Sequence, residues 1–151
     1  MKQGKTFADL AVGMQVAIQN TVSEQDVIDF ARISGDHNPL HMDEEYAKTT
    51  QFKGRIAHGA LSASYISAIL GNDLPGPGAV FMELNLKFVR PVRIGDTVVS
   101  TAEVIEMIEP WCSARTGAAT RHISHGPKTL VSKISRQTST VAASRSWCGM
   151  T

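Results

Sequence analysis

Hydrophobic positions follow helical spacing in the first half of the chain. Ser23 precedes an acidic stretch that is typical of a helix N-terminus, and apolar residues then recur at helical intervals until Gly35. Two further helices are predicted, over Asp43–Thr50 and over Gly59–Leu70. The second of these carries a broad apolar surface, so we expect it to lie mostly buried in the core.

Strand patterns follow the PGPG turn at residues 75–78. From Val80 to Val89 apolar residues alternate with mostly polar ones, a period of two that predicts a strand with one buried face. The apolar set is Val80, Met82, Leu84, Leu86 and Phe88. A turn at residues 94–96 and a second strand over Thr97–Ile108 come next. A buried helix followed by antiparallel strands predicts an α+β domain whose sheet packs on that helix.

Composition narrows the possible classes of protein. A length of 151 residues with 42% hydrophobic content suits one soluble domain, and a net charge of +1 offers no footprint for nucleic acid. We find neither the apolar core of a signal peptide nor an uncharged run of membrane-spanning length. The cysteines, Cys112 and Cys148, are expected to be reduced thiols. These features predict a cytoplasmic protein with neither a nucleic-acid nor a membrane partner.

Acid and imidazole groups are concentrated in residues 36–70, as they are not in ordinary core segments. The sequence of this stretch is DHNPLHMDEEYAKTTQFKGRIAHGALSASYISAIL. Each buried charge or ring nitrogen must find a partner or cost several kcal/mol. Pro39 lacks a backbone donor and pushes Asn38 out of the α region, which predicts a loop here. Such a loop lets Asp36 and His41 turn toward one point, so the stretch is a candidate site.

Simpler interpretations apply to several histidines. His37 and His41 have the spacing of a zinc-binding helix, but Pro39 between them interrupts that helix, and we expect no metal site. His37 has the pattern of an exposed structural residue. His58 has either a structural role, capping the turn before the next helix, or a role in the site.

The pattern DHNPLHMD, followed by FKGRIAHG and a Ser-bearing apolar helix, resembles the R-specific enoyl-CoA hydratases of the MaoC-like dehydratase family in the hotdog superfamily. The resemblance runs from about Phe7 to Pro110, with LPGPGAVFMELNLKFVRPVRIGDTV as a second block. It implies a hotdog fold, in which a curved antiparallel sheet wraps a central helix, here Gly59–Leu70, and two subunits usually pair as a homodimer.

The resemblance also implies an activity and the residues that carry it. The reaction is reversible hydration of a trans-2-enoyl-CoA to an (R)-3-hydroxyacyl-CoA, by a lyase of fatty acid metabolism with an acyl-CoA substrate and no cofactor. Asp36 and His41 match the catalytic dyad, Asn38 and Pro39 the turn that shapes it, and Gly59 the oxyanion donor. The other substrate-binding candidates are His58, Ser64 and Ser67, of which Ser67 matches the helix position that supports the Asp.

The chemistry requires these residue types independently of the family. Hydration needs a base that activates water at C3, an acid that protonates C2, and a donor for the thioester oxygen. Asp36 and His41 can serve as the first two, in either order, and we favour His41 as the base. The N–H of Gly59 lies at a helix start, where a free donor and the helix dipole both favour an oxyanion. The candidates for the CoA phosphates, each better explained as solvated surface charge, are Lys53, Arg55, Lys87 and Arg90.

Two alternative functions stay open at this point. A hotdog acyl-CoA thioesterase often places an acid on the central helix, but Gly59–Leu70 contains neither Asp nor Glu. A non-catalytic acyl-CoA-binding hotdog protein would keep the pocket without turnover. Intact Asp36 and His41 argue against this second alternative, whereas the C-terminal segment argues for it.

Residues 111–151 differ in kind from the rest of the chain. All 14 acidic residues precede Pro110, and the segment beyond it is rich in Ser, Thr, Ala and Arg, as in a replaced C-terminus or a natural extension. Only Thr129–Ser135 and Ser139–Ala143 have strand-like composition. We therefore expect a single domain over 1–151 in which 111–151 is atypical and poorly ordered, and a sheet that is incomplete on one side.

Overall fold

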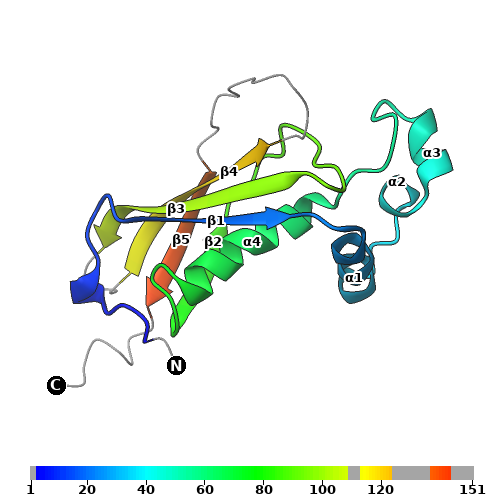
Figure 1. Cartoon of the computed structure of the whole chain (residues 1–151). Coiled ribbons are helices and arrows are strands. Elements are labelled where there is room, and N and C mark those ends of the chain that lie inside the picture. The colour runs from blue at the N-terminus through cyan, green and yellow to red at the C-terminus, as the bar shows by residue number, and fades with distance from the viewer. Residues whose placement is uncertain (1–2, 109–112, 124–136, 144–151) are drawn as a thin grey trace.

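The computed structural model describes residues 3–108, 113–123 and 137–143. Five antiparallel strands form one sheet in the order β1-β3-β4-β5-β2, and helix α4 lies along one face of it (Figure 1). The strands are β1 (Gln15–Thr21), β2 (Ala79–Leu84), β3 (Thr97–Ile108), β4 (Ser113–Ile123) and β5 (Gln137–Ala143). The helices are a 3-10 turn (Phe7–Asp9), α1 (Glu24–Ser34), α2 (Pro39–Met42), α3 (Glu44–Thr49) and α4 (Gly59–Asn72).

Helix α4 forms the core with the sheet, as its apolar surface predicts. Its buried residues Ile66, Ile69 and Leu70 pack with Ala102 of β3. Burial of such side chains contributes roughly 1.5–3 kcal/mol each, which explains why a helix of weak amphipathicity is held on the sheet. No helix among the described residues is long and apolar enough to cross a membrane.

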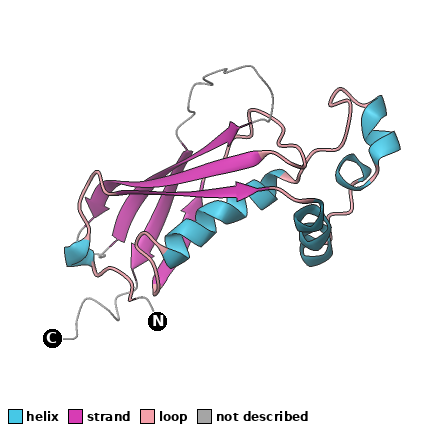
Figure 2. Cartoon of the chain, in the orientation of Figure 1, coloured by secondary structure: helices cyan, strands magenta, loops and turns pink. Residues whose placement is uncertain are grey.

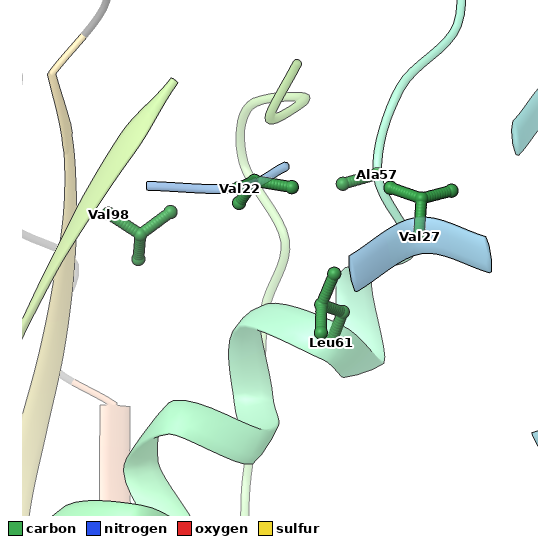
Figure 3. Close-up of a cluster of buried hydrophobic side chains, with 5 residues drawn as sticks. All are labelled: Val22, Val27, Ala57, Leu61 and Val98. Carbon is green, nitrogen blue, oxygen red and sulfur yellow. The ribbon is translucent and has the colours of Figure 1, made fainter. Parts of the chain in front are cut away.

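A second cluster fixes the start of α4. Leu61 in its first turn packs with Val98 of β3, Val22 after β1, Val27 of α1 and Ala57 before α4 (Figure 3). Figure 2 shows α1, α2 and α3 together beyond the same end of the sheet, next to the N-terminus of α4. The cluster therefore joins the sheet to the segments that carry the candidate site residues.

Helix α1 has the boundaries that the sequence predicts. The Ser23 side chain accepts a hydrogen bond from the backbone N–H of Asp26, and the Asp26 carboxylate accepts from Ser23 in return. At the other end Gly35 adopts the left-handed conformation, with φ 78°, which Gly reaches without strain. The chain leaves this cap at Asp36, so the end of α1 sets the position of that residue.

The buried face predicted for the strand over residues 80–89 is wrong over the first half of that strand. Phe81 pairs with Val141 and Glu83 with Thr140, so Met82 is an extra residue in a β-bulge. The bulge reverses the alternation, because Phe81 and Leu84 pack toward the core whereas Met82 is 65% exposed. The strand also ends at Leu84, five residues before the predicted end.

The expectation of an incomplete sheet is also wrong. Strand β4 pairs with β3 from Thr97↔Ile123 to Ile108↔Ser113, and β5 joins β4 to β2. Ladder hydrogen bonds use backbone groups, so a Ser- and Thr-rich segment can complete a sheet without the apolar alternation that sequence reasoning seeks. Ser139–Ala143 lies within β5, whereas the predicted strand over Thr129–Ser135 falls outside the described residues. The expectation that residues 111–151 are poorly ordered stays a prediction.

Ser100 generates a prediction about stability. Its side chain is fully buried on β3, and its hydroxyl has no hydrogen-bond partner among the described residues. Removing an unpaired buried hydroxyl removes a desolvation penalty, so we expect Ser100→Ala to leave the free energy of unfolding unchanged or higher. Val98→Ala is the matched control on the same face and should cost about 2 kcal/mol. Urea denaturation compares the two, and an equal loss in both would contradict the assignment.

Candidate active site

Asp36, His41 and His58 come together from three different segments. Asp36 follows the end of α1, His41 lies on α2, and His58 is the N-cap of α4. One nitrogen or carboxylate oxygen from each lies within 4.8 Å of the others. The structure thus brings the expected acid and imidazole groups to one point, with Asp36 exposed and both histidines buried.

The hydrogen bond of His41 determines which of its nitrogens is free. Nδ1 lies 2.8 Å from the carbonyl oxygen of Ile56, and a carbonyl oxygen can only accept. Nδ1 therefore carries the proton when the imidazole is neutral, and Nε2 holds a lone pair. In this tautomer Nε2 of His41 is the ring atom that can accept a proton.

A short turn aims Asp36 and His41. The Asn38 side chain accepts from the backbone N–H of Leu40 at 3.0 Å, and Pro39 occupies the first helical position of α2. The backbone N–H of Asn38 donates to Asp36 Oδ1 at 3.2 Å, which orients the carboxylate. The interruption expected at Pro39 is thus a helix start, and it separates His37, which is exposed, from His41.

His58 contacts both Asp36 and His41. Its Nε2 donates to the backbone carbonyl of Asp36 at 2.9 Å, and its ring packs on His41 with centroids 3.9 Å apart. The ring of Phe30 on α1 also packs on the His58 ring, at a centroid distance of 5.0 Å. Although His58 is the N-cap of α4, its side chain makes no capping hydrogen bond. Its contacts therefore favour a role in the site over the simpler one of capping a turn.

Gly59 is the first residue of α4, so its N–H has no partner within the helix. The N-terminal end of a 14-residue helix also carries a partial positive charge. A Cβ at this position would lie 3.0–3.1 Å from three ring atoms of Phe88. Sequence reasoning missed Phe88 as a site residue because it treated this position as part of a strand.

The two helix serines do not join the cluster. Ser64 and Ser67 are both exposed on α4, and the Ser64 hydroxyl donates to the carbonyl of Leu61 at 2.6 Å. Neither makes a hydrogen bond to Asp36 within the described part of the chain. Support of Asp36 by Ser67 therefore stays a prediction.

Arg55 braces the helices around the site. Its guanidinium pairs with Glu24 of α1 and, at 3.9 Å, with Glu44 of α3. The hydrogen bond from Arg55 holds the pKa of the Glu24 carboxyl below its ordinary value. Two carboxylates already balance this charge, which favours a structural role for Arg55 over binding of a CoA phosphate.

Residues 9–125 match the MaoC like domain family. The chain belongs to this family. It is 52% identical over 102 residues to an (R)-specific enoyl-CoA hydratase of Rhodospirillum rubrum, covering 68% of this chain and 71% of the relative. It is 50% identical over 109 residues to a 3-hydroxybutyryl-CoA dehydratase of Methylorubrum extorquens, covering 72% and 69%. The family match extends beyond Pro110, where the resemblance noted in the sequence ends, and it includes β4.

Solved structures agree with this membership. The R-hydratase PhaJ1 from Pseudomonas aeruginosa superposes with a TM-score of 0.81 at 36% identity, over 93% of this chain and 86% of that one. The (R)-hydratase from A. caviae gives 0.79 at 31% identity, over 89% and 97%. With the antiparallel sheet on α4, these likenesses confirm the α+β hotdog fold.

The hydrogen bonds of the two histidines predict their tautomers. We expect neutral His41 to carry its proton on Nδ1 and neutral His58 on Nε2, because each of these atoms faces a backbone carbonyl. Long-range ¹H–¹⁵N correlation spectra recorded at about pH 8, above the ordinary titration of His, distinguish the two forms. The opposite tautomer at His41 would remove its free Nε2 and contradict its use as a base.

Proposed function

We propose that the protein catalyses reversible hydration of trans-2-enoyl-CoA to (R)-3-hydroxyacyl-CoA. The observation that carries the proposal is the convergence of the Asp36 carboxylate and the His41 imidazole, whose Nδ1 is held by the Ile56 carbonyl, beside the N-terminus of α4. The names of two relatives, a hydratase of enoyl-CoA and a dehydratase of 3-hydroxybutyryl-CoA, describe the two directions of such a reaction and support it.

Asp36 and His41 activate the water molecule and transfer the protons. A water molecule between Asp36 and His41 loses a proton to His41 Nε2 while its oxygen bonds to C3 of the enoyl group. C2 receives a proton from the same side, either from Asp36 or from the imidazolium of His41, which gives syn addition. Because Asp36 is exposed, the dyad can exchange protons with solvent between turnovers.

The oxyanion forms at Gly59. As water adds to C3, negative charge develops on the thioester oxygen, and a donor aimed at that oxygen lowers the barrier. The N–H of Gly59 is such a donor, supported by the positive end of the α4 dipole. His58 acts as a positioning residue, since it holds the Asp36 carbonyl and packs on His41.

The proposed reaction needs no metal or redox cofactor, because it moves only protons and a water molecule. Asp36, His41 and His58 together are a set that could also hold a metal ion, since the backbone carbonyls occupy one nitrogen of each ring and leave the other available. We propose that the groups serve acid–base chemistry on an acyl-CoA substrate in the cytoplasm. The thioesterase alternative is less well supported, since α4 carries no carboxylate over Gly59–Asn72.

Substitution of the dyad tests the proposed function. Asp36→Asn and His41→Ala should each lower kcat by about 10² to 10⁴ while the fold is kept, because positioned acid–base groups contribute rate factors of that size. His37→Ala is the matched control, since His37 lies between them in the chain and is exposed. Loss of enoyl absorbance with crotonyl-CoA and a longer enoyl-CoA, with chiral analysis of the product, measures the reaction. Near-wild-type turnover in either dyad variant would remove the assignment, and release of free CoA without hydration would favour the thioesterase.

We also propose a homodimer that covers the edge strand β2. The sheet has two edges, and exposed positions on β1 are Gln15, Ala17, Gln19 and Thr21. On β2 the exposed positions include two apolar residues, Val80 at 49% and Met82 at 65%. An apolar edge strand is a pairing hazard unless a second subunit covers it, so β2 is the better-supported interface.

Light scattering tests the dimer and its interface. The wild-type mass should be about twice the chain mass of 16.3 kDa. Met82→Lys should shift the protein toward the monomer, because a charge on the covered edge must be desolvated. Ala17→Lys on the opposite edge is the control and should leave the mass unchanged. A monomeric wild type with full activity would exclude the dimer. If Ala17→Lys yields the monomer and Met82→Lys does not, the interface lies at β1 and not at β2.

A further inference from the structure

Phe88 has an unusual combination of exposure and contact. It lies in the segment between β2 and β3, and 60% of the residue is exposed. Three of its ring atoms nevertheless lie 3.0–3.1 Å from the point that a Cβ on Gly59 would occupy. The ring thus covers the Cα of the proposed oxyanion donor while the rest of its apolar surface stays open.

We infer that Phe88 is a specificity-determining residue that contacts the thioester end of the substrate and limits bulk at C2. The inference rests on the proposed function, in which the thioester oxygen accepts from the Gly59 N–H. That oxygen is bonded to the carbonyl carbon, and the carbonyl carbon is bonded to C2. A ring packed on Gly59 is therefore placed to contact the first atoms of the acyl chain.

The exposed part of the ring fits this role. Aromatic surface in water gains free energy when apolar atoms cover it, and the enoyl group is a planar apolar unit. Val89 next to it is equally exposed, at 61%, but the three atoms nearest to the Cβ point of Gly59 all belong to Phe88. The two neighbours therefore provide a residue that carries the inference and a control that does not.

The contact also explains the glycine. Gly59 is a helical residue with no positive φ, so the backbone itself would accept Ala, which has the higher helix propensity. A Cβ at 3.0 Å from the ring is closer than carbon atoms normally approach. Gly59→Ala therefore requires the Phe88 ring to shift by a few tenths of an ångström, which would change the ring's position at the proposed oxyanion donor.

Substrate discrimination gives the first test. We would measure kcat/KM for crotonyl-CoA and for its 2-methyl-branched analogue in wild type, Phe88→Ala, Phe88→Leu and Val89→Ala. Removing the ring should raise the branched-to-linear ratio about tenfold, since one methyl group in an apolar pocket typically changes discrimination by that factor or more. Leu, which keeps apolar bulk, should give a smaller rise and serves where Ala impairs folding. Val89→Ala should leave the ratio unchanged.

Rescue gives the second test. Gly59→Ala should lower kcat/KM for crotonyl-CoA, and Gly59→Ala with Phe88→Ala should recover part of it, because the second change removes the collision. Thermal unfolding of each variant separates this rescue from a change in stability. The inference is overturned if the wild type is active and the branched-to-linear ratio of kcat/KM is unchanged in both Phe88 variants. It is also overturned if the double variant recovers no activity. Neither outcome affects the proposed function. A wild type that hydrates neither crotonyl-CoA nor a longer enoyl-CoA overturns the proposed function and the inference with it.

Discussion

The packing of the first turn of α4 against the sheet is the constraint on which the site depends. Leu61 packs in one cluster with Val98 and Val22, and this packing fixes the direction in which the helix starts. The residue before the helix, His58, and its first residue, Gly59, take their positions from that packing. Because interiors are close-packed, a shift of the helix start would be felt at both residues. A hydrophobic cluster that takes no part in the reaction thus sets the positions at which the proposed proton transfer and charge stabilisation occur.

The hydrogen bonds of the two histidines then determine their tautomers. Both rings direct one N–H to a backbone carbonyl, His41 to Ile56 and His58 to Asp36, so each has its tautomer set by the backbone. Each neutral ring therefore keeps one nitrogen with a lone pair, Nε2 in His41 and Nδ1 in His58, and His58 Nδ1 is buried without a hydrogen-bond partner among the described residues. In the proposed mechanism His41 is the base, and His58 positions Asp36 by holding its backbone carbonyl.

The sequence predicts local features well and non-local ones poorly. Helix α1 follows from Ser23, Asp26 and Gly35, all within one segment, and β3 has the predicted bounds. The convergence of Asp36 and His41 was also predictable, since the Pro39 turn brings near neighbours together. By contrast, the bulge at Met82 depends on pairing with β5, and the contact of Phe88 with Gly59 joins two distant segments. No periodicity within a single segment carries that information.

Exposure around Gly59 argues for the direction from which a substrate enters. His41 and His58 are buried, whereas Asp36 and Phe88 are exposed. We propose that a thioester approaches the Gly59 N–H from the side on which the carboxylate and the aromatic ring are exposed. Such an approach suits hydration, since the exposed carboxylate can hold water that arrives from solvent while the buried imidazole of the proposed base is shielded from it. If Phe88 limits bulk at C2, as we infer, selection among acyl groups takes place on this exposed side of the site.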